Sequence, residues 1–129
     1  MGKTARELST EELRGYQPYQ ALEFFRKDPA VAARRDFGWK IARAVAHLLR
    51  AEYGATRIVV FGSLAREILF TPWSDIDLAV WGVTPEQYFS AAGAAMDMGL
   101  DLGIKVDIVD PENCSEAFQA DIVADGVAI

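Results

Sequence analysis

Two acidic residues stand close together in an otherwise apolar stretch, and they are the first candidates for chemistry in this sequence. Asp75 and Asp77 are two positions apart in "SDIDLAVWG", residues 74–82. A third acid, Asp107, occurs in the apolar segment "IKVDIV", residues 104–109. A buried carboxylate is costly unless a partner compensates its charge. Clustered carboxylates therefore favour a hard divalent cation with oxygen ligands, above all Mg²⁺.

A Gly-Ser pair upstream of these acids has the composition of a phosphate-binding turn. Gly62 and Ser63 follow the β-branched segment 56–61 and precede "LAREIL" (64–69), which we predict to be a short helix. Glycine lets the backbone approach a ligand closely, and a helix start offers free N–H groups and a positive dipole end to an anion. Arg66 lies one turn further on, where it could reach the same anion. Next to an acidic cluster, such a turn is typical of phosphoryl or nucleotidyl transfer through metal ions.

Both features also have an ordinary structural interpretation. The acids can be solvated side chains on a strand face, and Ser63 can be a helix cap in a plain strand-to-helix turn. Lys105 can form a structural ion pair with an aspartate or contact a nucleotide. Trp73 can pack on the domain, stack on a base or meet a partner protein. We interpret His47 and Cys114 as ordinary helix residues.

Three predicted strands would position the acids. They cover residues 56–61, 75–81 and 104–109, where β-branched and apolar residues are concentrated. Because side chains alternate between the two faces of a strand, the aliphatic residues share one face and all three aspartates the other. We expect the aliphatic faces to pack on helices and the aspartates to lie together on the open side of the sheet.

Helices are predicted between and around the strands. In chain order they are a short helix after a capping box at Ser9 and Glu12, one that begins at Asp28-Pro29, one over 39–53 that ends at Gly54, one over 85–99 after Thr84, and a last one from near Pro111 to Gly126. The order predicts an α/β (α+β) fold, a small mixed β-sheet flanked by helices and covered mainly on one face.

Length and charge narrow the classes of function. The 129 residues carry a net charge of -6, which disfavours direct binding of a nucleic-acid polymer but permits a nucleotide or a protein partner. No apolar run is long enough to cross a membrane, and no secretory signal is apparent. The single cysteine excludes an internal disulfide. These features favour a cytoplasmic protein without a membrane partner.

The segments "GSLAR", "SDIDL" and "KVDIV" together resemble the DNA polymerase β-type nucleotidyltransferase superfamily, in particular its minimal nucleotidyltransferase (MNT) branch. The resemblance implies a polymerase β-like nucleotidyltransferase fold over residues 38–129, preceded by an N-terminal helical extension over 1–37. It implies that Gly62 and Ser63 bind the triphosphate, with Arg66 as a further candidate for a phosphate contact. The metal ligands and catalytic residues would be Asp75, Asp77 and Asp107.

The same resemblance implies an activity and a partner. The activity is Mg²⁺-dependent transfer of a nucleoside monophosphate, such as AMP from ATP, to an acceptor hydroxyl, with two metal ions in the site. Members of this branch often act as antitoxins, so the implied acceptor is a tyrosine of a HEPN-type helical toxin. A non-catalytic antitoxin that acts by contact and a stand-alone transferase for a small molecule remain alternatives.

Two departures from the family pattern bear on activity. Glu67 stands where the family usually has glycine, and the connection 64–74 is longer and more apolar than usual. A negative charge beside the phosphate turn is expected to weaken nucleotide binding, which favours the contact-only alternative.

Overall fold

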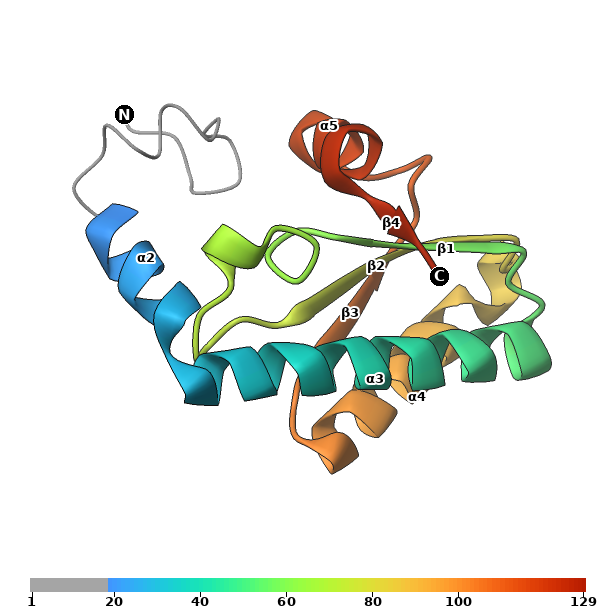
Figure 1. Cartoon of the computed structure of the whole chain (residues 1–129). Coiled ribbons are helices and arrows are strands. Elements are labelled where there is room, and N and C mark those ends of the chain that lie inside the picture. Colours follow the sequence, from blue (N-terminus) through green and yellow to red (C-terminus); the bar gives the residue numbers. More distant parts are fainter. Residues whose placement is uncertain (1–18) are drawn as a thin grey trace.

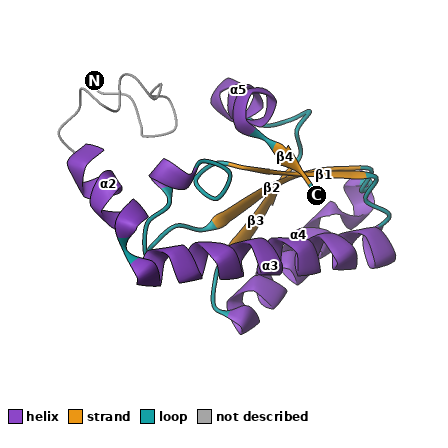
Figure 2. Cartoon of the chain, in the orientation of Figure 1, coloured by secondary structure: helices purple, strands orange, loops and turns teal. Residues whose placement is uncertain are grey.

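The computed structural model describes the chain from residue 19 to residue 129, so the helix predicted after Ser9 lies outside the described residues. Over that range a central sheet lies between helices (Figure 1, Figure 2). None of the described helices combines the length and the apolar composition of a membrane span.

The sheet has four strands in the order β3-β2-β1-β4. Its strands are β1 (Arg57–Phe61), β2 (Ile76–Trp81), β3 (Val106–Val109) and β4 (Val127–Ala128). Strand β1 pairs antiparallel with β2 and β4, whereas β2 and β3 are parallel. The predicted small mixed sheet is therefore confirmed. Strand β4 was not predicted, because two residues after Gly126 carry no periodic pattern.

One long helix, α3, runs beneath the sheet after the shorter α2 (Tyr19–Lys27). Helix α3 spans Pro29–Tyr53, and the predicted cap is confirmed, because the Asp28 side chain accepts a hydrogen bond from the Ala30 N–H. Gly54 ends the helix in the left-handed region, with φ 72°, as a glycine there can do without strain. The helix is continuous through residues 37 and 38, where the sequence suggested a boundary between an extension and a domain.

The last two helices are α4 (Pro85–Leu102) and α5 (Glu116–Asp125). Helix α4 starts where predicted. Helix α5 starts later than predicted, because the Asp110 side chain accepts a hydrogen bond from the Glu112 N–H and holds the residues after it in a turn. The cap of α5 is Ser115, whose hydroxyl accepts a hydrogen bond from the Phe118 N–H.

Helices cover both faces of the sheet. Helices α3 and α4 bury the aliphatic face, in a core that includes Ile41, Val45, Leu49, Ile58, Val60, Ile76, Leu78, Ala91 and Val106. Helix α5 lies on the opposite side (Figure 1), where Phe118 and Ile122 pack against Val59, Phe61 and Ala79. The second face, which was expected to be open, is therefore partly covered by α5, while the larger core lies on the predicted face. The last helix was expected from the sequence, but its pattern did not say which face it would cover.

Candidate functional site

The Gly-Ser segment forms a tight turn directly after β1. Gly62 has φ 73°, in the left-handed region that favours glycine. The Arg66 N–H donates a hydrogen bond of 3.1 Å to the Gly62 carbonyl and closes the turn. Ser63 is half-buried within it.

The predicted short helix over 64–69 was wrong in extent. Only Glu67–Leu69 forms one turn of 3-10 helix, and Arg66 before it is extended. Leu64 and Leu69 are both buried. Packing against the core, and not a regular series of helical hydrogen bonds, therefore fixes this segment. Any anion at the turn would therefore meet the backbone N–H groups of the turn itself, without a helix dipole behind them.

The strand register brings two of the three predicted acids side by side. Asp77 of β2 is opposite Asp107 of the parallel strand β3, and Phe61 of β1 is opposite Asp77 on the other side. Because directly opposed residues point to the same face of a sheet, both carboxylates lie on the face that α5 partly covers. Gly62 follows Phe61, so the turn begins next to the acid pair.

The third acid, Asp75, lies in the loop just before β2 and is half-buried. This loop is anchored to α3, because Arg34 donates a hydrogen bond of 3.0 Å to the Ser74 carbonyl. Arg34 was not singled out from the sequence, because a helix arginine forty residues away gives no local indication of such a contact.

The acids differ in their surroundings. Asp77 is only 7% exposed, which is rare for an aspartate, and it makes polar contacts within the protein. Asp107 is more open, and its Oδ2 lies 3.6 Å from Lys105 Nζ. The ion pair considered for Lys105 is thus present in the structure.

The donor set suits Mg²⁺ by its chemistry, since carboxylate oxygens are the ligands that this ion prefers. The described residues contain no preassembled group of three or more His, Cys, Asp or Glu side chains placed to share a metal ion. The register brings Asp77 and Asp107 together, and Asp75 adjoins them along the chain. A role for these three residues as metal ligands stays a prediction.

Arg66 is held by the last helix. Its Nε lies 3.6 Å from Asp125 Oδ2 at the end of α5, and its side chain is largely buried. Asp121, one turn earlier in α5, is also buried and makes polar contacts. The pairing of Arg66 with Asp125 was not expected from the sequence. Asp121 and Asp125 are four residues apart and therefore lie on one face of the helix. A phosphate contact by Arg66 stays a prediction, and it would compete with Asp125.

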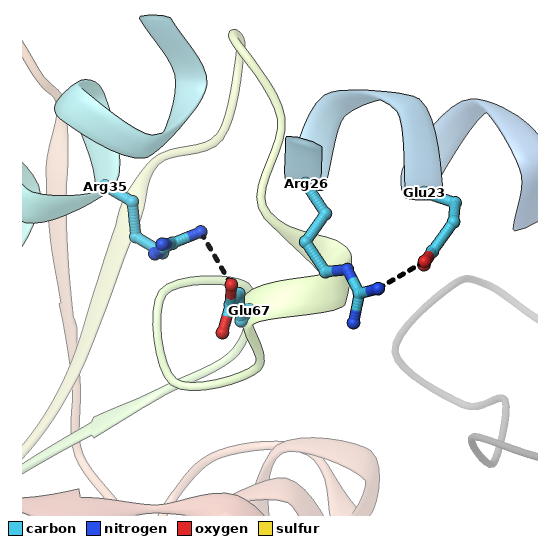
Figure 3. Close-up of polar contacts among 4 residues, drawn as sticks. All are labelled: Glu23, Arg26, Arg35 and Glu67. Atoms are coloured by element: carbon cyan, nitrogen blue, oxygen red, sulfur yellow. Dashed lines mark hydrogen bonds and ion pairs between the residues drawn. The ribbon is translucent and has the colours of Figure 1, made fainter. Parts of the chain in front are cut away.

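Glu67 faces α3. Its Oε1 lies 3.3 Å from Arg35 Nη1, as Figure 3 shows together with the neighbouring pair of Glu23 and Arg26 in α2. Arg35 therefore offsets the negative charge that the sequence places close to the Gly62 turn.

Trp73, in the same connection, is 76% exposed. Its ring forms a T-shaped contact with Phe25 of α2, with ring centroids 5.7 Å apart. Packing on the domain is thus present, while most of the ring remains accessible.

A cavity of about 490 Å³ lies beyond the acids, where β3 ends. It is lined by Tyr88, Ile108, Val109, Asp110, Asn113, Cys114, Ser115 and Phe118. Burial, with smaller contributions from Asp110 and Cys114, raises the pKa of Tyr88 to about 12. Cys114 is half-buried there.

Comparisons with known proteins agree on the fold. A family model described as polymerase beta, nucleotidyltransferase matches residues 44–129. No curated protein sequence matches the chain. Among solved structures, a mutant of a toxin–antitoxin complex named MntA-HpeT is similar with 25% identity and a TM-score of 0.52, over 67% of this chain and 69% of that one.

Two further solved structures are similar. A toxin–antitoxin structure with AMP-PNP has 24% identity and a TM-score of 0.54, over 67% of this chain and 70% of that one. At this identity, the similarity supports a shared fold and nothing further. A protein provisionally described as a minimal nucleotidyltransferase has 29% identity and a TM-score of 0.50, over 78% of this chain and 93% of that one.

Proposed function

Because this chain belongs to the polymerase beta nucleotidyltransferase family, we propose that it transfers a nucleoside monophosphate from a nucleoside triphosphate, such as ATP, to an acceptor hydroxyl. The observation that carries the proposal is the register at the end of the sheet. Asp77 and Asp107 are opposed on neighbouring strands, and Asp77 is also opposite Phe61, the residue before the Gly62 turn. The acid pair and the glycine turn thus adjoin, as metal-assisted attack of a hydroxyl on a bound phosphate requires.

Each part of the site has a role in the proposed reaction. Asp75, Asp77 and Asp107 would hold Mg²⁺, and two such ions would neutralise the charge that develops on the phosphates. The turn at Gly62 would bind the triphosphate through its backbone N–H groups, with the Ser63 hydroxyl beside them. The burial of Asp77 keeps water from competing for that carboxylate and keeps its orientation fixed.

We further propose that the acceptor is a tyrosine of a HEPN-type helical toxin, so that the chain acts as an antitoxin. The support is similarity to a structure of a toxin–antitoxin complex. The acceptor hydroxyl would have to reach the α-phosphate in line with the leaving pyrophosphate. The toxin would therefore dock beside the face that carries Asp77 and Asp107.

A second candidate function is an antitoxin that acts by contact alone. The observation that favours it is the engagement of Arg66 with Asp125, which occupies the side chain proposed for a phosphate. In that case the nucleotide site would be vestigial, and binding of the toxin would not depend on the acids.

The test combines the chain, its cognate toxin, Mg²⁺ and ATP, and measures the mass of the toxin. We expect the addition of one or more AMP units, which Asp107→Asn should slow much more than it weakens complex formation, because it removes charge at the reacting centre. Asp97→Asn, an exposed acid of α4, is the matched control and should leave transfer unchanged. If the toxin stays unmodified while Asp107→Asn still neutralises it, the contact-only function replaces the enzyme.

A further inference from the structure

A large groove lies outside the acid site, between α3 and the edge strand β4. Its volume is about 910 Å³, and it is lined by Asp36, Trp39, Lys40, Arg43, Ala46, His47 and Arg50 of α3 and by residues 127–129. The α3 residues recur at intervals of three and four, so they form one continuous stripe along the helix. Nothing in the proposed transfer reaction uses this groove.

The stripe is basic although the protein is acidic. Among the side chains of the lining, Lys40, Arg43 and Arg50 are positively charged and only Asp36 is negatively charged, whereas the side chains of the whole chain have a net charge of -6. The Arg43 guanidinium lies 5.7 Å from the centre of the Trp39 ring, and Arg50 donates a hydrogen bond to the main-chain oxygen of Ile129. Lys40 and Arg43 are exposed, so their charges are available to a ligand.

The other wall of the groove is an edge of the sheet that pairs with no further strand among residues 19–129. Residues 127, 128 and 129 all line the groove. Because the side chains of consecutive strand residues point to opposite faces, a wall that contains all three is formed by the edge of the strand. Strand β4 is last in the sheet order, and the Ile129 N–H donates to the Ile58 carbonyl of β1. Because the backbone groups of a strand alternate in direction, the N–H and C=O of Ala128 point away from β1, toward the free edge.

We propose that this groove binds an extended, acidic segment of a partner protein, which adds as a short strand to the edge of β4 and places its carboxylates on the basic stripe of α3. A strand edge supplies main-chain hydrogen bonds, and the alternation of side chains gives the added segment one face toward α3. The exposed apolar surface of Val127, 41% exposed, would be covered in the same step.

The groove suits a peptide better than a nucleic acid. A nucleic acid would gain from the positive charges but would leave the backbone groups at the edge of β4 without a strand to pair with. A short acidic peptide uses both walls. The proposal concerns binding alone and goes beyond nucleotidyl transfer, because none of the groove residues belongs to the acid site.

The test measures binding to the whole chain by fluorescence anisotropy with three labelled probes. These are a short peptide in which Glu and Val alternate, its counterpart in which Lys replaces Glu, and an oligouridine of the same length. We expect the acidic peptide to bind, more weakly at high salt, and the other two not to bind. No binding of the acidic peptide, or tighter binding of the oligouridine, would overturn the proposal.

Two variants separate the two walls. Lys40→Glu should weaken binding of the acidic peptide about threefold to tenfold, whereas Lys27→Glu, the same charge reversal at the exposed end of α2, should leave it unchanged. Ala128→Pro removes the outward N–H that would donate to the added strand, so it should reduce binding further. The variant is expected to fold, since proline is tolerated where an edge N–H faces away from the sheet. Circular dichroism and thermal unfolding establish that each variant folds. Equal affinities of the folded Ala128→Pro variant and the wild type would refute strand addition.

Discussion

Single residues in this site act in pairs. Glu67, which stands where the family usually has glycine, lies 3.3 Å from Arg35 and is mostly exposed, so solvent and Arg35 both reduce its effect on a nearby phosphate. Arg66 is the opposite case: Asp125 Oδ2 lies 3.6 Å from its Nε and offsets the positive charge that a phosphate would meet. The charge that a nucleotide would meet thus depends on contacts between the turn and two helices, which no local pattern predicts.

Tyr88 offers a test of burial at the scale of one residue. The pKa of its phenol is raised to about 12 in the folded protein, whereas an unperturbed tyrosine titrates near about 10. Between these values the unfolded chain loses the proton and the folded protein keeps it. The stabilisation is complete below the lower value and is lost as the pH rises through the window.

The variant Tyr88→Phe cannot ionise at this position. We therefore expect the free energy of unfolding to fall less steeply with pH above about 10 in this variant than in the wild type. Urea unfolding at several alkaline pH values measures the two slopes, and a neutral pH serves as the reference. Parallel slopes would show that the phenol is as solvated in the folded protein as in the unfolded chain.

At the scale of elements, the ends of α3 and the strands β1, β2 and β3 were predictable because they depend on local chemistry. Asp28 with Pro29 begins α3 and Gly54 ends it, as the sequence indicates. The alternation in β2 and β3 placed the aliphatic residues on the core face, as predicted. The 3-10 turn at Glu67–Leu69 and the strand β4 depend on tertiary packing, and local sequence predicted neither of them. The start of α5 depends on the local turn at Asp110, which the predicted helix start near Pro111 did not take into account.

Two glycines of α4 test how closely this helix packs on the sheet. A Cβ atom at Gly99 would lie 2.5 Å from the Ile104 carbonyl oxygen and 2.6 Å from Val106 Cγ2, closer than atoms can approach. Gly93 in the same helix has nothing within 4 Å of that position. We expect Gly99→Ala to lower the free energy of unfolding by about 1–3 kcal/mol, because the helix must move away from β3.

The matched variant Gly93→Ala should raise the free energy of unfolding by about 0.5–1 kcal/mol, because alanine loses less backbone entropy in a helix. Urea unfolding of both variants measures whether the free energy of unfolding falls for Gly99→Ala and rises for Gly93→Ala. A neutral effect of Gly99→Ala would mean that α4 sits farther from β3 than the contacts indicate.

For the whole molecule, the sequence predicted that Asp77 and Asp107 come together better than it predicted how the chain surrounds them. The Gly62 turn and the pair of Asp77 and Asp107 meet because the sheet register is set by alternating apolar residues, which are visible in the sequence. The cover over that face is not visible there. Helix α5 reaches the site through Phe118 and Asp125, and only the folded chain shows that these residues, far from the turn in sequence, contact its surroundings.

A ligand that binds only the folded state raises the stability of the whole molecule, and this provides the last test. At a concentration about tenfold above the dissociation constant, Mg²⁺-ATP should stabilise the protein by about 1.4 kcal/mol. Asp77→Asn should abolish this gain, since it removes a charged ligand from the predicted metal site. Asp97→Asn on the exposed side of α4 should retain it.

Because the substitution of a buried acid changes stability by itself, the quantity to compare is the shift in melting temperature within each variant, with ATP in EDTA as the metal-free reference. Equal shifts in the two variants would place the nucleotide away from the acid pair, and the proposed transfer would lose its site.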